Sequence, residues 1–126
     1  LAQIALRKCA PGLRVHAARD GVEALAALGC IPGSVGQVVP RVVLLDLKLP
    51  KLDGLEVLSQ LRAHPSTARI PVVMLTSSRL QSDVDKCYAA GANSYVVKPS
   101  SFQRFTGAMR QIVAYWLELN QPADPQ

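Results

Sequence analysis

Residues 41–54 read RVVLLDLKLPKLDG, and this stretch decides the fold. Residues 42–45 are consecutive apolar residues that lead directly into Asp46, and so short an apolar run is typical of a strand buried on both faces, as in a parallel sheet. Turn residues around Pro50 and Gly54 follow, and a helical pattern comes next. Asp46 is therefore expected at the carboxyl end of a strand, the edge at which open parallel sheets bind ligands. An aspartate that merely caps a helix or a loop is the alternative that this stretch leaves open.

Apolar strands and amphipathic helices alternate along the whole chain. The expected strands cover residues 13–18, 41–45, 70–75 and 94–97, and the expected helices cover residues 1–9, 22–28, 55–62, 84–90 and a last segment from Ser101. Strict alternation with apolar strands predicts an α/β fold, a doubly wound parallel sheet with helices on both faces. Residues 29–40, which contain three Gly and two Pro, are expected to form a surface loop.

Two of the expected helices carry signals for their ends and their buried faces. Ser82 and Asp85 resemble a capping box at the start of the helix over 84–90, and Gly91 is expected to end it. Cys87 lies on the apolar face of that helix, which favours a packing role. In the last helix one stripe is expected to face the core, and it consists of Phe102, Phe105, Met109, Ile112, Val113 and Trp116.

The bulk composition bounds the class of protein. With 126 residues, of which 49% are hydrophobic, the chain suits one domain, expected over residues 1–120 with a C-terminal tail at 121–126. No apolar run is long enough to span a bilayer and no signal peptide opens the sequence, so a cytoplasmic location and no membrane partner are expected. The net charge of +5 comes from scattered Lys and Arg without a basic run, so no nucleic-acid partner is expected.

The cysteines and histidines show no metal-ligand spacing. Cys9, Cys30 and Cys87 lie far apart without a C-x-x-C pair, and neither His16 nor His64 stands at ligand spacing to them. Reduced thiols are the simplest interpretation.

Polar side chains stand at the ends of three expected strands: Asp46, Thr76 and Lys98. Right-handed crossovers bring the carboxyl ends of parallel strands to one edge, so these residues can converge. A carboxylate, a hydroxyl and an ammonium suit a phosphoryl group, because the carboxylate can form an acyl phosphate and the other two can bind the added oxygens. Taken singly, Thr76 is better explained as a strand-end cap and Lys98 as a solvated residue before a proline.

Several motifs together resemble the receiver domains of two-component response regulators, and they extend over essentially the whole chain: LLDLKLPKLDG, IPVVMLTSS, AGANSYVVKP and DGVEAL. The resemblance implies that Asp46 is the phosphate acceptor and Thr76 the hydroxyl that follows the phosphoryl group. By the same resemblance Lys98 is the lysine of the site and Tyr95 the aromatic switch residue. The peptide bond between Lys98 and Pro99 would be cis, a form accessible essentially only before proline.

The resemblance also implies a flavodoxin-like strand order, 2-1-3-4-5, whose first strand ends in an acidic pair that helps to hold Mg²⁺. This sequence starts inside the helix after that strand, so the first strand and its acidic pair are missing from it. Asp46 and the backbone carbonyl of Lys48 are the metal ligands that remain, and poor Mg²⁺ binding is therefore expected. Since loss of a central strand would leave two strand edges unpaired, we expect further residues upstream in the natural protein.

The function implied is that of a phosphorelay response regulator. A sensor histidine kinase would transfer its phosphoryl group to Asp46, and Lys48 and Ser78 would tune the slow self-catalysed hydrolysis that follows. Thr76 would move inward and Tyr95 would rotate, which changes the affinity of a surface for another protein. The loop before Arg41 and the AYWLELN segment look most like single-domain regulators that partner bacterial phytochromes. The last helix and the neighbouring strand are a candidate homodimer face.

Two other functions are compatible with such a fold. A pseudo-receiver would act as an interaction module that never takes phosphate, and it becomes the favoured interpretation if the acidic strand is truly absent from the natural protein. A flavodoxin-like domain that binds a nucleotide or another small ligand is the second alternative. It is disfavoured because the sequence contains no Gly-rich phosphate loop.

Overall fold

The computed structural model describes residues 12, 14–34 and 39–123. Its elements follow in the order α2 (Gly21–Ala27), β1 (Val43–Leu45), α3 (Gly54–Ala63), β2 (Val72–Thr76), α4 (Gln81–Ala89), β3 (Ser94–Val97), α5 (Phe102–Val113) and the π-helical segment η1 (Ala114–Leu119). Within this part of the chain the strands form one parallel sheet in the order β1-β2-β3. The predicted parallel α/β fold is therefore confirmed, and the three strands follow the last three positions of the expected order.

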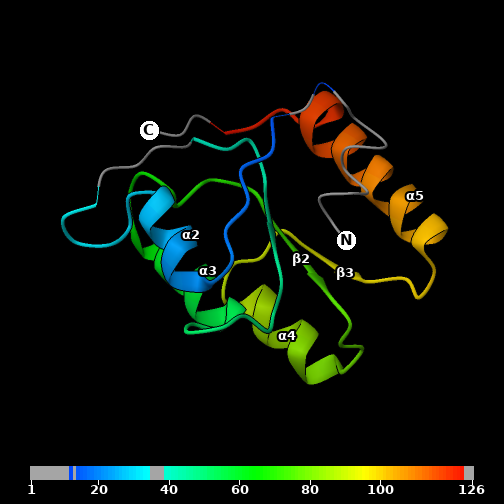
Figure 1. Cartoon of the computed structure of the whole chain (residues 1–126), viewed down its shortest axis with the longest axis horizontal. Coiled ribbons are helices and arrows are strands. Elements are labelled where there is room, and N and C mark those ends of the chain that lie inside the picture. The colour runs from blue at the N-terminus through cyan, green and yellow to red at the C-terminus, as the bar shows by residue number, and fades with distance from the viewer. Residues whose placement is uncertain (1–11, 13, 35–38, 124–126) are drawn as a thin grey trace.

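The sheet is covered on both faces. Figure 1 shows α5 on one side of the strands and α2, α3 and α4 on the other. In β2, Val72 and Met74 point into the cluster formed with α2, α3 and α4, whereas Val73 and Leu75 point into the cluster with α5. No more than 3% of any of these side chains is exposed, and each such burial stabilises the fold by roughly 1.5–3 kcal/mol.

Polar side chains cap three of the helices at their predicted starts. Asp20 accepts the amide of Glu23 at the start of α2, Asp53 accepts that of Glu56 at the start of α3, and Ser101 accepts that of Arg104 at the start of α5. Each cap satisfies a backbone donor that the first helical turn leaves unpaired. These caps determine where the chain leaves the sheet edge and enters each helix.

The start of α4 differs from the prediction. The helix begins at Gln81, three residues earlier than expected, and Leu80 is its N-cap without a side-chain hydrogen bond. The capping box of Ser82 and Asp85 is therefore wrong, because Asp85 instead accepts a hydrogen bond from Gln81 one turn earlier on the helix surface. The predicted end is correct: Gly91 follows the helix with a φ of +105°, a conformation that favours glycine.

Residues 14–18 do not form the strand predicted over 13–18. They have no regular secondary structure and are exposed, Val15 to 43%. In the expected order 2-1-3-4-5 the second strand pairs only with the first, and the described residues contain no strand before β1 with which residues 14–18 could pair. The predicted helix over residues 1–9, with Cys9, lies outside the described residues.

The Lys98–Pro99 peptide bond is trans, like every peptide bond in the described part of the chain. The predicted cis bond is therefore wrong for this structure. An X–Pro bond prefers the trans form by about 0.5–1 kcal/mol when no tertiary contact selects the other isomer.

The predicted stripe of the last helix faces the core along most of its length. Phe105, Met109 and Ile112 are buried, and Val113 and Trp116 pack beside them. Phe102, at the first turn, is 37% exposed. Beyond Val113 the helix continues as η1, in which the rings of Tyr115 and Trp116 stack edge to face with centroids 4.9 Å apart.

Cys87 has the packing role that its position in α4 predicted. Its side chain is fully buried in the cluster between the sheet and α2, α3 and α4. Burial raises the pKa of the Cys87 thiol, and the nearby carboxylate of Asp83 raises it further. A thiol held in its neutral form is a weak nucleophile, which agrees with a structural role.

Arg62 ties α3 to the amino-terminal edge of the sheet. Its guanidinium donates to the carbonyls of Ile70 at 2.8 Å and Gly91 at 2.9 Å, and to Asn93 Oδ1 at 2.8 Å. Asn93 Oδ1 also accepts the amide of Val72, the first residue of β2. Burial lowers the pKa of the Arg62 guanidinium. This network holds the turns before β2 and β3 together, at the end of the sheet opposite Asp46.

No helix among residues 12, 14–34 and 39–123 combines the length and the apolar character needed to cross a membrane.

Candidate functional site

The three predicted residues meet at the carboxyl edge of the sheet. Asp46 directly follows β1, Thr76 is the last residue of β2, and Lys98 directly follows β3. Lys98 Nζ lies 2.7 Å from Asp46 Oδ2, although the two residues are 52 positions apart. About a third of each side chain is exposed, at 34% for Lys98 and 32% for Asp46. The convergence predicted from the sequence is therefore found between the carboxylate and the ammonium.

Thr76 joins this edge through the sheet register. It pairs with Val97, and its carbonyl accepts the amide of Lys98 at 2.8 Å. Its side-chain oxygen accepts the amide of Ser78 at 3.4 Å, and the residue is only 3% exposed. The hydroxyl is therefore held beside the site within the first turn of the loop that leaves β2.

The Asp46 carboxylate uses both oxygens. Oδ1 accepts the amide of Lys48 at 3.2 Å, while Oδ2 accepts Lys98. The backbone amide and the ammonium therefore fix the orientation of the carboxylate at the sheet edge. The helix-cap alternative for Asp46 does not hold, because Asp53 caps the next helix.

The loop after Asp46 folds back onto its own start. The amide of Gly54 donates to the carbonyl of Leu47 at 2.7 Å. A Cβ on Gly54 would collide with the backbone carbonyl oxygen of Asp46. Glycine at the first position of α3 therefore allows the helix to pack against the backbone of Asp46.

The same loop is anchored to α2. Lys51 adopts a positive φ of 69° and its ammonium lies 3.4 Å from Asp20 Oδ2. The amide of Gly21 donates to the carbonyl of Pro50 at 3.4 Å. The Glu23 amide lowers the pKa of the Asp20 carboxyl below its ordinary value, and Lys51 lowers it further. Two contacts thus hold the loop after Asp46 from outside the sheet.

A pocket of about 430 Å³ opens over this edge. Its walls come from the ends of β1 and β2 and from the start of α4, and the lining residues are Asp46, Lys48, Thr76, Ser77, Ser78, Arg79, Leu80 and Asp83. The predicted flanking residues Lys48 and Ser78 are among them. Arg79, Leu80 and Asp83 were not predicted because α4 was placed too late in the sequence. The i,i+4 pair of Gln81 and Asp85 was the signal for an earlier start.

Ser78 links the pocket to two other elements. Its carbonyl accepts the hydroxyl of Tyr95, on β3, at 2.9 Å. Its own hydroxyl donates to Asp83 Oδ2, on α4, at 2.5 Å. Tyr95, the predicted switch residue, is half-buried and packs against the cluster between the sheet and α2, α3 and α4. The loop after Thr76 is therefore connected to both β3 and α4.

The residues at this edge do not make a complete metal site. Asp46 supplies one carboxylate, and the described chain holds no group of three His, Cys, Asp or Glu residues that could bind a metal ion. Mg²⁺ demands near-octahedral coordination by hard oxygens, often from one or two carboxylates with water and phosphate. Asp46 and the carbonyl of Lys48 offer too few oxygen ligands for such a set. The Asp46 carboxylate is also already paired with Lys98.

The family model of the response regulator receiver domain matches residues 2–110. The chain therefore belongs to the receiver domains of response regulators, the signal-receiving modules of two-component phosphorelays.

Similar proteins agree with this assignment. The probable methanogenesis regulatory protein FilR2 of Methanothrix harundinacea is 43% identical over 112 residues, which span 89% of this chain and 72% of FilR2. Response regulator Rcp1 of Synechocystis is 38% identical over 100 residues, which span 79% of this chain and 68% of Rcp1. Neither match supports the pseudo-receiver or the small-ligand alternative.

Solved structures show the same fold. The phosphorylated cyanobacterial phytochrome response regulator RcpA aligns with a TM-score of 0.88 and 32% identity, over 98% of this chain and 88% of RcpA. The Mn²⁺-bound form of Rcp1 aligns with a TM-score of 0.82 and 30% identity, over 98% of this chain and 91% of that structure. Related receiver domains thus bind divalent metal ions.

The close approach at Gly54 predicts that the loop after Asp46 is sensitive to an added methyl group. Gly54→Ala should lower the free energy of unfolding by about 1–3 kcal/mol, because the added methyl group forces the Asp46 backbone away. Gly107→Ala is the matched control: a Cβ there meets no atom within 4 Å, and alanine in a helix interior should stabilise by about 0.5–1 kcal/mol. Urea unfolding of both variants measures the difference. Equal effects of the two substitutions would contradict the proposed contact.

Proposed function

We propose that Asp46 is the residue on which this receiver domain accepts its phosphoryl group, from a phosphohistidine of a sensor histidine kinase. The observation that carries the proposal is the carboxylate at the carboxyl edge of the sheet, 2.7 Å from the Lys98 ammonium and open to a pocket. An oxygen of Asp46 attacks phosphorus in line, the bond from phosphorus to the histidine nitrogen breaks, and its electron pair stays on the imidazole.

Lys98 and Thr76 are proposed to bind the transferred group. The ammonium of Lys98 is paired with a carboxylate oxygen of Asp46. It is therefore already within reach of the oxygens that the phosphoryl group adds. As a point charge on a flexible stem, it can move with the group while it forms. Thr76 lines the same pocket, and its hydroxyl can donate to a phosphoryl oxygen after a rotation about χ1.

The switch is proposed to run through the loop that follows Thr76. Thr76 Oγ1 accepts the amide of Ser78, and the Ser78 carbonyl accepts the hydroxyl of Tyr95. A rotation of Thr76 toward a phosphoryl group removes the acceptor of the Ser78 amide. The loop then shifts and moves the Ser78 carbonyl, which is the hydrogen-bond acceptor of Tyr95. The result is a population shift between two arrangements of β3 and α4.

Mg²⁺ is proposed as the cofactor of the natural protein, in which residues upstream of this sequence would supply the acidic pair. Asp46 and the Lys48 carbonyl would then complete the oxygen set, and the ion would neutralise phosphoryl charge. The Mn²⁺-bound form of Rcp1 supports a divalent ion in a related domain.

The proposed kinase is a bacterial phytochrome, and support comes from RcpA, described as a cyanobacterial phytochrome response regulator. The proposed compartment is the cytoplasm, where thiols such as the free Cys30 and Cys87 stay reduced. We place the domain at residues 1–120, with 121–126 as a tail.

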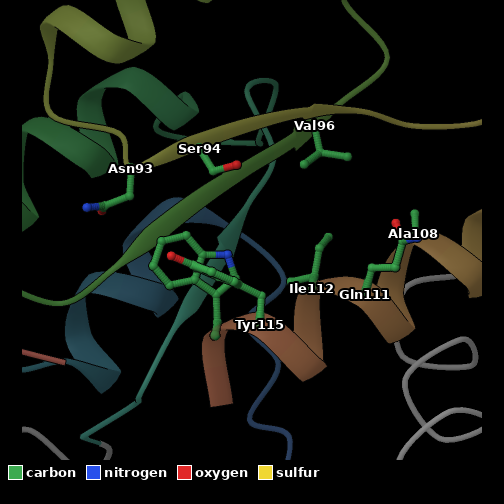
Figure 2. Close-up of a pocket in the computed structure, with 8 residues that line it drawn as sticks. Asn93, Ser94, Val96, Ala108, Gln111, Ile112 and Tyr115 are labelled. Carbon is green, nitrogen blue, oxygen red and sulfur yellow. The ribbon is translucent and has the colours of Figure 1, made fainter. Parts of the chain in front are cut away.

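A homodimer through α5, η1 and β3 is proposed as the output form. Figure 2 shows a groove between Ser94 and Val96 of β3 and Ile112 of α5, with Tyr115 at its end. Tyr115 and Leu119 are 48% and 75% exposed on η1. Arg110 and Glu118 are both exposed on the same continuous helix. A two-fold antiparallel pairing would therefore set the arginine of one copy toward the glutamate of the other, which favours a second copy as occupant.

The acceptor assignment predicts the outcome of a labelling experiment. Incubation with acetyl phosphate, or with a cognate kinase, should label the protein in an acid-stable, base-labile form, and Asp46→Asn should abolish the label. Glu56→Gln is the control, because it removes an exposed carboxylate of α3 outside the pocket. Phosphate-affinity electrophoresis measures both variants. A label that persists in Asp46→Asn ends the assignment.

The role of Lys98 predicts a separation of phosphorylation from switching. Lys98→Ala should still accept a label, but the ring resonances of Tyr95 should no longer shift on phosphorylation, since the group that draws the phosphoryl oxygens inward is gone. NMR of tyrosine-labelled protein measures this. Lys86→Ala, an exposed lysine of α4, should behave like the wild type. Wild-type shifts in Lys98→Ala would contradict the role given to the lysine.

The dimer proposal predicts an effect of charge on η1. Leu119→Asp should weaken self-association by at least tenfold, because it sets a carboxylate into the apolar face of both copies. Val22→Asp, at a site that is 38% exposed on α2, on the other side of the sheet from α5 (Figure 1), is the control. Light scattering of the phosphorylated protein gives the mass. A monomeric mass for the wild type at every concentration would exclude the homodimer.

A further inference from the structure

Asp83 is a second carboxylate in the pocket that contains Asp46, and the proposed phosphoryl transfer gives it no role. Its Oδ2 lies 2.5 Å from Ser78 Oγ. That separation is within the range of a hydroxyl that donates to an ionised carboxylate and is shorter than most neutral hydroxyl bonds. Ser78 Oγ is the donor of this bond and the Asp83 carboxylate oxygen is the acceptor.

A serine hydroxyl has one proton and two lone pairs, and the structure accounts for most of this capacity. The proton points to Asp83, and one lone pair accepts the amide of Leu80 at 3.3 Å. The Ser78 hydroxyl has no proton left for a phosphoryl oxygen. What it can still offer inside the pocket is one lone pair, which accepts a hydrogen bond from water.

The direction of this hydroxyl is set by Asp83 because the Ser78 backbone is held separately. The amide donates to Thr76 Oγ1 at 3.4 Å, and the carbonyl accepts the hydroxyl of Tyr95 at 2.9 Å. Before Thr76 turns toward a phosphoryl group, the main chain is held from β2 and β3, and the remaining freedom of Ser78 is the rotation of its side chain. The bond to Asp83 involves neither Thr76 nor Tyr95, so it does not depend on that turn. The bond to α4 removes that freedom.

We propose that Asp83 is a positioning residue that shortens the lifetime of the phosphorylated state by holding the Ser78 hydroxyl as a hydrogen-bond acceptor. The inference rests on Asp46 as the proposed acceptor. The Ser78 hydroxyl then cannot donate a hydrogen bond that would stabilise the phosphoryl group. Its free lone pair orients a water molecule in the pocket.

The hydrolysis balances without a further reagent. The water oxygen forms a bond to phosphorus, and the bond from phosphorus to the Asp46 oxygen breaks with its electron pair returning to the carboxylate. Both water protons leave on the phosphate, which releases its surplus proton to solvent. Asp83 and Ser78 end as they began.

Asp83→Asn reverses the polarity of the contact. The amide nitrogen of asparagine can donate to Ser78 Oγ, which frees the Ser78 proton to bind a phosphoryl oxygen. One hydrogen bond gained by the phosphorylated state should lengthen its half-life by about three- to tenfold. The change is nearly isosteric, so the fold is kept.

The experiment follows loss of label from the full chain after acetyl phosphate is removed, in the wild type, Asp83→Asn, Ser78→Ala and the double variant. The expected result is a longer half-life in Asp83→Asn, and equal half-lives in Ser78→Ala and the double variant, because Asp83 acts through Ser78. Asp85→Asn removes a carboxylate from the same helix outside the pocket, and it should leave the half-life unchanged.

Three results would overturn the inference. An unchanged half-life in Asp83→Asn means that the contact does not act on hydrolysis. A longer half-life that persists in the Ser78→Ala background, or that Asp85→Asn reproduces, means that Asp83 acts by charge repulsion and not through the hydroxyl. In each of these cases the acceptor assignment itself stands if the wild type is labelled and Asp46→Asn removes the label. If the wild type shows no such label, both the acceptor assignment and the role of Asp83 are overturned.

Discussion

The parallel register of β2 between β1 and β3 is the constraint on which the site depends. Leu45 pairs with Met74 and Thr76 pairs with Val97, so the carboxyl ends of the three strands lie at nearly the same level. Since the register of a parallel sheet also decides which face each side chain points to, a slip of one residue would turn Val73 and Leu75 away from α5. Core packing and site geometry are therefore two consequences of the same pairing, and the apolar side chains of β2 stabilise both.

The ion pair of Asp46 and Lys98 contributes little to stability, and the role proposed for it is a functional one. Each side chain is about one-third exposed, and partly exposed pairs of this kind are commonly worth about 0–1 kcal/mol. Its importance lies in position, because the ammonium already occupies the place where negative charge would increase on phosphorylation. The opposite end of the sheet is held differently, by the Arg62 guanidinium among backbone carbonyls, where removal of the charge would leave several acceptors unpaired.

The loop between β2 and α4 departs from what sequence patterns indicate, and it is also where the site connects to the rest of the domain. Ser78 bonds to Thr76, Tyr95 and Asp83, which belong to three different elements. Local rules failed here for a physical reason: α4 begins without a side-chain cap, so the strongest local signal for a helix start is absent. The helices α2, α3 and α5 each begin after an aspartate or serine cap, and each starts within one residue of the position expected from the sequence.

The sequence alone determined the alternation of strands and helices, the places of β1 and β2 to within two residues at each end, and the convergence of Asp46, Thr76 and Lys98. It could do so because hydrophobic periodicity and the handedness of crossovers are local or general properties of any chain. Only the tertiary structure decided whether residues 14–18 pair in the sheet, which isomer the Lys98–Pro99 bond adopts, where α4 begins and that Asp83 enters the pocket. Each of these depends on which segments are neighbours in space. A strand needs a partner to satisfy its backbone groups, and a hydroxyl takes its direction from whichever acceptor the fold brings to it.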